Sequence, residues 1–305
     1  MKKKPQASLG QLRTEQRNQA SARFDEESTL DMVRIMNRED AKVAAAVRDA
    51  LPQIAQAIDV IAEKLRRGGR LIYVGAGTSG RIAALDASEC PPTFGTAPKM
   101  VQFVIAGGPK ALGAAVEANE DSREFGQRDI AKRKPGKKDV VVGIAASGRT
   151  PYTVAAVEFA RQRGAATIGV CCNADSPLEK AAQIAILAPV GPEVVTGSSR
   201  LKAGTAQKMV LNMLTTGAMT RLGYIYGNLM VNVQPNNDKL VDRATRILQD
   251  AAIVDRVRAS AALNASKMSV PVALVMLKTG LNPTKARGLL KAHAGNVRVA
   301  IASRR

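Results

Sequence analysis

The stretch Arg70-Leu-Ile-Tyr-Val-Gly-Ala-Gly-Thr-Ser-Gly80 joins a short apolar run to a turn rich in glycine and hydroxyl residues. The apolar half does not alternate between apolar and polar residues, which is typical of a strand buried on both faces of a parallel sheet. The second half places Thr78 and Ser79 where a helix would begin, so free backbone N–H groups and two hydroxyls can cradle a phosphate there. The stretch therefore predicts a strand, an anion-binding turn and a helix.

Apolar runs of the same kind recur along the chain, and each ends in small or polar residues; they lie at 101–105, 139–144, 166–172 and 184–187. Helical stretches separate or follow them, at 111–133, 151–164 and 200–222. Strands that alternate with helices predict an α/β fold with a doubly wound, mainly parallel five-stranded sheet. Ligands of such sheets bind at the carboxyl ends of the strands.

The remaining segments differ in composition from this core. Residues 1–25 are polar and basic, and we expect them to form a disordered tail. Helical patterns at 28–67 lead into the sheet, with Pro52 expected in the first turn of a new helix. Three short helices are predicted at 251–263, 270–277 and 282–291. The predicted domains are therefore 1–25, 26–240 and 241–305, the last a small helical domain.

The charge of the chain is strongly positive but unevenly distributed. With 45 Lys and Arg against 26 Asp and Glu, the formal charge is +19, which first suggests a nucleic-acid partner. Residues 1–23 carry +5 and residues 241–305 carry +9, which leaves +5 for the long middle. Aromatic residues that would stack on bases make up 3% of the chain, and Trp is absent. We therefore expect no nucleic-acid partner.

Histidine and cysteine are scarce, which narrows the possible chemistry. A lone His293 excludes multi-histidine metal sites and disfavours a Ser-His-Asp triad. Cys90, Cys171 and Cys172 do not form a disulfide framework, and Cys171 and Cys172 are expected to be small buried hydrophobes, as in a reducing compartment. The most apolar long window, 210–233, is interrupted by polar residues and predicts a core helix rather than a membrane span. We expect a cytoplasmic protein with no membrane partner.

Two further polar loops resemble the turn at 75–80. Ala146-Ser-Gly-Arg-Thr-Pro-Tyr152 places Ser147, Gly148, Arg149 and Thr150 at a helix start, with Pro151 in its first turn. A third cluster opens the 200–222 helix and contains Ser198, Ser199 and Lys202. Ordinary helix capping also accounts for these serines, and capping is compatible with phosphate binding.

The turn at 75–80 also matches the G-x-G-x-x-G pattern of dinucleotide-binding folds. Such folds hold the ribose with an acidic residue at the end of the next strand, and here that strand ends in Ala106-Gly-Gly108. We therefore favour a phosphate or phosphosugar over a dinucleotide. A purely structural glycine turn is the third option.

Several longer motifs carry a resemblance to one family. Gly75-Ala-Gly-Thr-Ser-Gly-Arg81, Leu85-Asp-Ala-Ser-Glu-Cys-Pro-Pro-Thr-Phe94, and the segments 140–152 and 193–208 resemble the N-acetylmuramic acid 6-phosphate etherases, which are built on a sugar-isomerase (SIS) domain. The similarity covers nearly the whole chain beyond the tail. It implies a SIS fold, a C-terminal unit like a ubiquitin-associated domain, and a homodimer that uses no metal or other cofactor.

The resemblance also implies a reaction. N-acetylmuramate 6-phosphate would lose its D-lactyl ether, giving N-acetylglucosamine 6-phosphate and D-lactate in cell-wall sugar recycling. Opening the sugar to its aldehyde acidifies the proton on carbon 2, so that lactate can leave carbon 3 and water can then add. Elimination of this kind needs one base and one acid. Since the α/β part has no histidine, carboxylates are the candidates.

The resemblance places these carboxylates on Glu89 and Glu120. Glu89 would be the acid that protonates departing lactate, and Glu120 the base at carbon 2, although the roles could be exchanged. Taken alone, each residue would be read as a solvated carboxylate on a helix, Glu89 near a helix end before Pro91 and Pro92. The family pattern Glu-Gly-Ala-Glu-Asp is here Glu117-Ala-Asn-Glu-Asp121, which retains the second glutamate.

Two other functions fit a SIS-type sequence. A sugar-phosphate-sensing regulatory protein would bind its ligand through the same serines, but a DNA-binding regulator needs a helix-turn-helix module that residues 1–67 do not display. A phosphosugar aldose–ketose isomerase would need a base but no acid for an ether oxygen. Release of lactate from N-acetylmuramate 6-phosphate separates all three functions.

Overall fold

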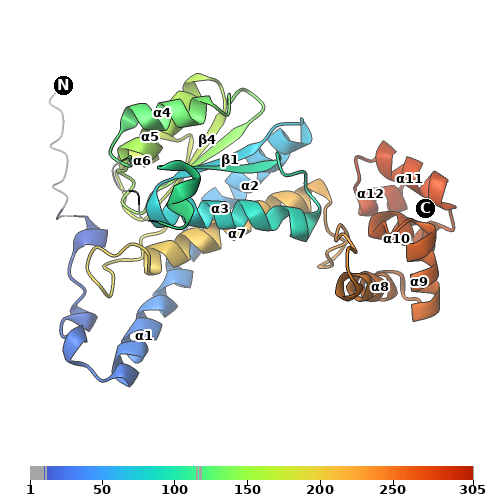
Figure 1. The fold of residues 1–305 in the computed structure, drawn as a ribbon, viewed down its shortest axis with the longest axis horizontal. Helices are drawn as coiled ribbons and strands as arrows, with labels where there is room; N and C mark the ends of the chain where they lie inside the picture. The colour runs from blue at the N-terminus through green and yellow to red at the C-terminus, as the bar shows by residue number, and fades with distance from the viewer. Residues whose placement is uncertain (1–9, 11, 115, 117–118, 305) are drawn as a thin grey trace. The chain divides into compact units, whose positions relative to one another are not determined.

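A computed structural model describes residues 10, 12–114, 116 and 119–304 (Figure 1). The chain divides into two compact units. The first contains the described residues up to Ala87 together with Lys99–Thr215, and the second contains Ser88–Pro98 with the residues from Thr216 onward. The sheet and its phosphate-type loops belong to the first unit.

The first unit is built on a parallel sheet. Within the described residues its five strands are β1 Leu71–Gly75, β2 Val101–Ile105, β3 Val140–Ile144, β4 Ala166–Cys171 and β5 Ile184–Leu187. Each predicted strand is confirmed to within one residue at either end. Every residue of β1 and β3 is buried, because helices cover both faces of the sheet.

The strand order β2-β1-β3-β4-β5 determines where a ligand can bind. After β1 the chain moves to one side to form β2 and then returns to the other side to form β3. Gly75 and Ile144, the last residues of β1 and β3, are paired in register. The loops that follow these two strands therefore lie side by side at the switch point of the sheet, where open α/β folds bind ligands.

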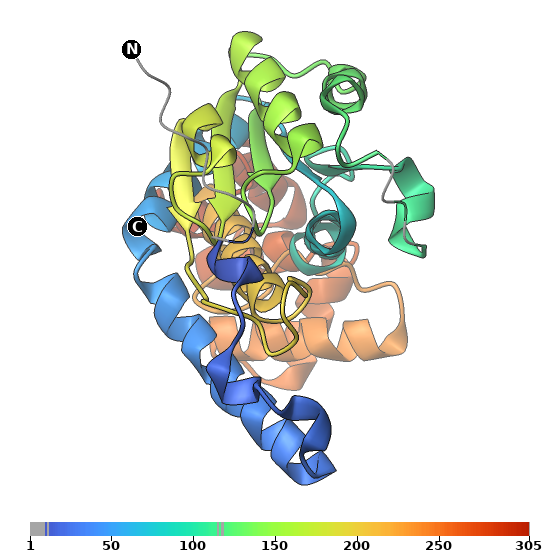
Figure 2. The same ribbon diagram turned by 90° about the vertical axis from the view of Figure 1, so that its left-hand side faces the viewer.

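Helices lie on both faces of the sheet (Figures 1 and 2). The helices up to residue 222 are α1 Thr29–Arg48, which projects away from the sheet, and α2 Leu51–Arg66, α3 Gly77–Phe94, α4 Arg123–Ala131, α5 Pro151–Gln162, α6 Pro177–Ala181 and α7 Lys202–Leu222. Tyr152, Val157 and Leu178 of α5 and α6 are fully buried in one core with Ile72 and Val141 of the sheet. Pro52 stands in the first turn of α2, as predicted.

The helix predicted at 111–133 is confirmed from Arg123 to Ala131, but its described residues before Arg123 are not α-helical. A 3-10 turn covers Gly108–Leu112, residues 119–121 form a turn, and α4 begins at Arg123. Gly107 and Gly108 have φ of 84° and 67°, a left-handed backbone that separates β2 from this 3-10 turn. Ser122 then starts α4 by accepting a hydrogen bond from the Phe125 N–H. Residues 115, 117 and 118 of the predicted helix lie outside the described residues.

The N-terminal segment was expected to be disordered, and over residues 12–25 this expectation does not hold. Short 3-10 turns cover Arg13–Glu15, Gln19–Ser21 and Phe24–Glu26. Leu12 and Thr14 are 6% and 2% exposed. A polar composition indicates disorder because it supplies little apolar area, but here hydrogen bonds to the first unit hold the segment. Residues 1–9 and 11 of the predicted tail lie outside the described residues.

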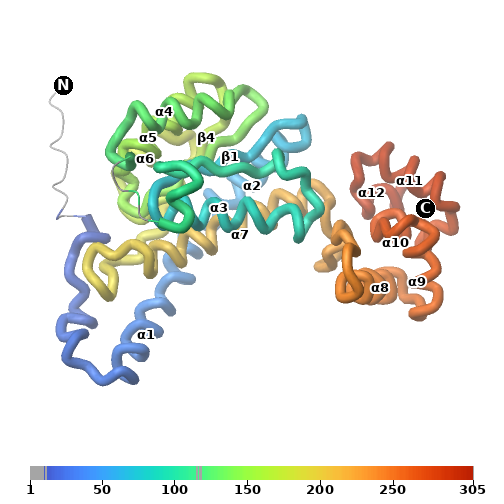
Figure 3. The backbone as a smooth tube through the Cα atoms, viewed as in Figure 1, coloured from blue at the N-terminus to red at the C-terminus, as the bar shows by residue number. Residues whose placement is uncertain are grey.

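The second unit contains short helices around its own core (Figure 3): α8 Asp238–Ala252, α9 Arg256–Ala265, α10 Val270–Thr279, α11 Pro283–Ala292 and α12 Val297–Ala302. The three helices predicted in this part correspond to α9, α10 and α11. Asp255 delays the start of α9, because its side chain accepts a hydrogen bond from the Arg258 N–H. The core extends back to Val231, so this unit reaches beyond the predicted 241–305.

None of the described helices is long and apolar enough to cross a membrane alone. Helices α9 and α10 satisfy length and composition criteria as a pair, but they are bent by 118° at their junction. The apolar window at 210–233 begins inside α7, where Val210 and Leu214 are fully buried, so its prediction as a core helix is confirmed there.

Candidate functional site

The loop after β1 has the geometry of an anion-binding turn. Helix α3 begins at Gly77, whose φ is 52°, and Thr78 and Ser79 occupy its first turn. A Cβ on Gly80 would lie 2.5 Å from Ile105 Cγ1, so only glycine lets α3 pack this closely on the end of β2. Thr78 is half-buried and Ser79 is 8% exposed. Both hydroxyls thus lie at a helix N-terminus, where backbone N–H groups favour an anion.

The loop after β3 is tightly constrained. Gly148 has a φ of 67°, and a Cβ there would lie 2.3 Å from Ser176 Oγ. The backbone N–H of Arg149 donates to Ser147 Oγ over 3.1 Å. Thr150 precedes α5 without capping it through its side chain, and Pro151 occupies the first turn. Since β1 and β3 are neighbours, the two loops that carry the predicted residues follow adjacent strands at the carboxyl end of the sheet.

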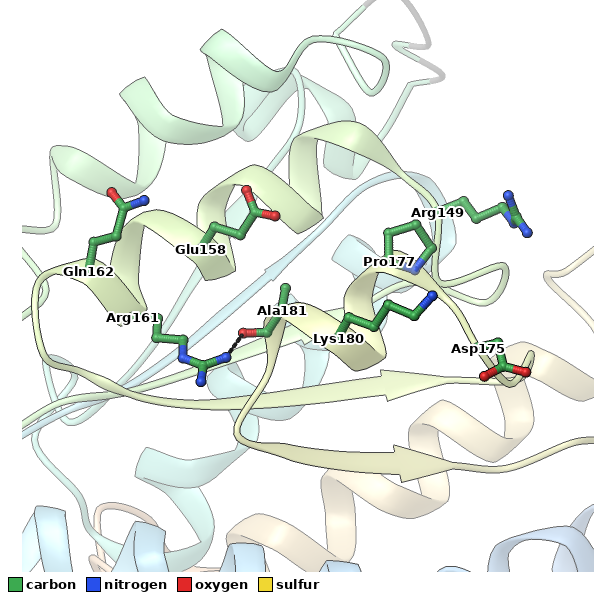
Figure 4. A pocket seen from close by; sticks show the side chains of 8 residues that line it. All are labelled: Arg149, Glu158, Arg161, Gln162, Asp175, Pro177, Lys180 and Ala181. Carbon is green, nitrogen blue, oxygen red and sulfur yellow. Dashed lines mark hydrogen bonds between the residues drawn. The ribbon is translucent and has the colours of Figure 1, made fainter. Parts of the chain in front are cut away.

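Arg149 is a cation with an unusual environment. Its Nε atom is buried and has no hydrogen-bond partner among the described residues. Arg149 also lines a pocket of about 620 Å³ between α5 and α6 (Figure 4), together with Glu158, Arg161, Gln162, Asp175, Pro177, Lys180 and Ala181. Of the predicted site residues, Arg149 is the one that the described lining includes. The pocket therefore adjoins the loop after β3 without coinciding with the predicted site.

The third predicted cluster, around Ser198 and Ser199, lies beside the loop after β1. A Cβ on Gly204, in the first turn of α7, would lie 3.5 Å from Thr78 Cγ2 and 3.6 Å from the Ser199 carbonyl oxygen. The start of α7 is therefore packed against the start of α3. Both serines are half-buried.

Lys202 does not have the environment that was predicted for it. Its side chain is 1% exposed, and its Nζ donates to Glu39 Oε2 over 2.5 Å. Its ammonium is thus paired with a carboxylate from α1 rather than presented to a ligand. The sequence does not reveal this, because Glu39 is 163 residues away along the chain. Lys202 therefore supports the loop before α7, which corrects its prediction as a phosphate ligand.

Glu39 is the centre of this buried network. Burial raises the pKa of Glu39, but hydrogen bonds from Lys202, Lys42 and Asn18 outweigh it and lower the pKa to about 2. Asn18 Nδ2 donates to Glu39 Oε2 over 2.9 Å. Glu39 is therefore ionised at neutral pH, and it neutralises a lysine that is excluded from water.

Glu193 is a structural residue of the site that sequence reasoning missed. Its side chain is fully buried and accepts hydrogen bonds from the backbone N–H groups of Lys202, over 3.0 Å, and Ala203, over 2.9 Å. It thus occupies donors of the first turn of α7 that would otherwise attract a ligand anion. Burial raises the pKa of this carboxyl above its usual value, although the two N–H groups offset part of this effect.

Glu89 is exposed on α3. Helix α3 continues through Pro91 and Pro92 to Phe94, so Glu89 lies in the last part of the helix. One turn before Glu89, the buried Asp86 accepts hydrogen bonds from Tyr73 Oη over 2.8 Å and from Thr215 Oγ1 over 3.1 Å. Burial raises the pKa of Asp86. These contacts attach α3 to β1 and α7.

Glu120 is half-buried in the turn before α4, and not on a helix as its neighbours suggested. Its carbonyl oxygen accepts a hydrogen bond from the Tyr152 N–H over 3.0 Å, which attaches the turn to the start of α5. Glu120 thus lies beside the loop that carries Ser147 and Arg149. It belongs to the first compact unit, whereas Glu89 belongs to the second.

The potential metal ligands, among them the three cysteines, lie outside the phosphate-type loops at 75–80 and 146–152. Among the residues that the structure describes, no three His, Cys, Asp or Glu side chains are grouped to hold a metal ion. Cys171 and Cys172 are buried, which confirms their predicted burial, and Cys90 is buried as well. Burial raises the pKa of both Cys171 and Cys172.

Solved structures with this fold include sugar-phosphate enzymes. A phosphoheptose isomerase from Francisella tularensis matches with a TM-score of 0.50 at 19% identity, over 63% of this chain and 98% of that protein. The likeness shows the fold alone. Family models agree with it: the N-terminal SIS domain of glucokinase regulatory protein matches residues 53–161, and the SIS domain matches residues 133–217.

Much closer relatives span the whole chain. The N-acetylmuramic acid 6-phosphate etherase 1 of Enterococcus faecalis is 51% identical over 292 residues, which cover 96% of this chain and 97% of that protein. The N-acetylmuramic acid 6-phosphate etherase of Vibrio vulnificus is 53% identical over 293 residues, or 96% of this chain and 98% of that protein. With this identity over nearly its full length, the chain belongs to the N-acetylmuramic acid 6-phosphate etherase family.

Proposed function

We propose that this chain cleaves the D-lactyl ether of N-acetylmuramate 6-phosphate, yielding N-acetylglucosamine 6-phosphate and D-lactate. The observation that carries the proposal is identity above 50% to etherases over both compact units, not over the SIS domain alone. The neighbouring loops after β1 and β3 support it, because they supply hydroxyls and helix N-termini suited to a phosphate.

The phosphate is bound by the loops at the switch point. Thr78 and Ser79 supply hydroxyls at the start of α3, and Ser147 and Thr150 supply them at the start of α5. The start of α5 suits an anion better than that of α7, because Glu193 already occupies N–H groups of α7. Arg149, whose Nε lacks a partner within the described chain, supplies positive charge.

The reaction is an elimination followed by an addition. With the sugar open, Glu120 takes the carbon-2 proton, the bond from carbon 3 to the ether oxygen breaks, and Glu89 protonates the departing lactate oxygen. Water then adds its hydroxyl to carbon 3 while its proton passes to Glu89, and Glu120 returns a proton to carbon 2, so both carboxyls regain their starting states. The hydrogen bond from Tyr152 supports the role of Glu120, because it holds this turn beside the phosphate-type loop.

Release of D-lactate from N-acetylmuramate 6-phosphate by the purified chain tests the proposal. Glu89→Gln and Glu120→Gln should each abolish release while the product N-acetylglucosamine 6-phosphate still raises the melting temperature. The exposed Glu27 offers a matched control, since Glu27→Gln should release lactate like the parent chain. Full turnover in both site variants would contradict the assignment of the acid and the base.

A sugar-phosphate-sensing regulatory protein is the second candidate, favoured by the match of residues 53–161 to the glucokinase regulatory protein domain. It predicts binding of N-acetylmuramate 6-phosphate without release of lactate. It is less supported, because the full-length relatives are etherases.

Assembly and location are part of the proposal. The enzyme acts as a homodimer in the cytoplasm and uses no metal. Light scattering coupled to size exclusion should give twice the chain mass of 32.2 kDa, and a monomer mass would contradict the dimer.

A further inference from the structure

We propose that the N-terminal strap, residues 12–26, positions the phosphosugar site, with Thr14 and Asn18 as its positioning residues. The proposal rests on the phosphosugar site of the proposed function. Figures 1 and 2 both show this dark blue segment beside the yellow loop that leads into α7. The strap precedes the sheet by many residues in the sequence, yet in space it lies beside the loop that follows β5.

Asn18 connects the strap to the segment before α7. Its Nδ2 donates both to Glu39 Oε2, over 2.9 Å, and to the carbonyl of Pro192, over 3.1 Å. Ser21 Oγ adds a hydrogen bond to the Val194 carbonyl over 2.8 Å. These contacts lie on both sides of Glu193, the residue that caps the first turn of α7.

The strap also touches the loop that carries Ser198. A Cβ on Gly197 would lie 3.2 Å from Glu15 Oε2, so the side chain of Glu15 packs against this loop. Lys202, at the other end of the loop, is anchored by Glu39, which Asn18 also contacts. The loop is therefore held at its beginning, its middle and its end by the strap or by groups bonded to it.

Thr14 connects the strap to the loop after β3. Its side chain is 2% exposed, and its Oγ1 accepts a hydrogen bond from Asn173 Nδ2 over 3.2 Å. The same Nδ2 donates to the carbonyl of Ala146 over 3.2 Å. Ala146 directly precedes Ser147, so Asn173 links Thr14 to the backbone of the predicted phosphate loop.

The strap therefore contacts the loop before α7 directly and reaches the loop after β3 through Asn173, and it links these two loops to each other. A buried polar contact is costly to lose, because the remaining partner is left unsatisfied. Loosening the strap should let the loops drift and weaken phosphate contacts in the ground state and the transition state alike. Uniform weakening of this kind raises KM and leaves kcat nearly unchanged.

Asn18→Ala and Thr14→Val test this inference, with Gln19→Ala, at an exposed strap position, as the matched control. Each test variant should raise KM for N-acetylmuramate 6-phosphate on the order of fivefold to tenfold, the loss of about one hydrogen bond, with kcat within twofold. Gln19→Ala should leave both KM and kcat unchanged. Thr14→Ser, which restores the hydroxyl, should recover most of the lost affinity.

Calorimetric binding of N-acetylglucosamine 6-phosphate separates this inference from the proposed function. Weaker binding in both test variants, by a similar factor, supports the strap even if the parent chain releases no lactate. A lowered melting temperature with unchanged KM and unchanged binding would assign the strap a purely structural role and overturn the inference. Equal loss of affinity in Gln19→Ala would overturn it as well.

Discussion

Glu39 of α1 and Lys202 of α7 form an ion pair that is excluded from water, with Lys202 Nζ 2.5 Å from Glu39 Oε2 and the side chains 4% and 1% exposed. The pair links the N-terminal helices to the loop that precedes α7. Removing one member of a buried pair leaves the other charge without compensation, which is more costly than replacing both.

Glu39→Gln should therefore be strongly destabilising. We expect the free energy of unfolding in urea to fall by about 3–5 kcal/mol, because the Lys202 ammonium stays buried without a carboxylate. The surface pair of Glu63 and Arg67 on α2 is the matched control, and Glu63→Gln should cost less than about 1 kcal/mol. A double variant, Glu39→Leu with Lys202→Met, should be more stable than Glu39→Gln alone. Similar costs for Glu39→Gln and Glu63→Gln would show that the buried pair contributes little.

The Glu39 carboxylate should also make the stability of the folded chain depend on pH. The pKa of Glu39 is lowered from 4.5 to about 2 in the folded chain. The folded chain thus releases the Glu39 proton more readily than the unfolded chain does. The contribution of this carboxylate to folding stability is therefore complete above pH 4.5 and is lost as the pH falls toward 2. Melting temperatures measured between pH 6 and 2 should decline steeply in the parent chain and less steeply in Glu39→Gln. Parallel profiles would contradict the assigned pKa.

Gly148 and Gly108 form a matched pair, since both have a φ of 67°. A Cβ on Gly148 meets Ser176 Oγ at 2.3 Å, whereas one on Gly108 meets nothing within 4 Å. Both alanine variants should lose about 1–2 kcal/mol of stability from the left-handed backbone. Gly148→Ala should lose more, and should also weaken binding of N-acetylglucosamine 6-phosphate because the loop after β3 must move. Equal effects of the two variants on binding would indicate that the loop holds no ligand.

The cysteines should be unreactive in the folded chain. All three are buried, and burial raises the pKa of Cys171, so little thiolate forms near neutral pH. A chromogenic disulfide reagent should label them at a rate set by unfolding and should label all three at once in urea. Rapid labelling of one thiol in the native chain would place it at an accessible surface.

The strands could be predicted from sequence because each is a short buried apolar run bounded by turn residues. Residues Gly75 and Ile144 end such runs, and the parallel order then requires their loops to be neighbours. The predicted 111–133 helix was too long because Ser122, a residue type that starts helices, was treated as an interior position. Among the described residues, a 3-10 turn covers Gly108–Leu112 and α4 begins at Arg123.

The candidate site was predicted only where local sequence decides it. Thr78, Ser79 and Ser147 were found because strand ends and helix starts are local features. The pairing of Lys202 with Glu39, and the strap contacts of Thr14 and Asn18, join residues separated by more than 150 positions. Patterns within one sequence carry no signal for such contacts, and the polar strap was therefore expected to be disordered.

The central claim is that the carbon–oxygen bond at carbon 3 of the sugar breaks by elimination. The most direct test is the position of solvent isotopes in both products after turnover of N-acetylmuramate 6-phosphate in D₂O and in H₂¹⁸O. We predict solvent deuterium at carbon 2 and ¹⁸O at carbon 3 of N-acetylglucosamine 6-phosphate, and no ¹⁸O in D-lactate, which leaves with the original ether oxygen. A product without deuterium at carbon 2, or with ¹⁸O in lactate, would contradict the account.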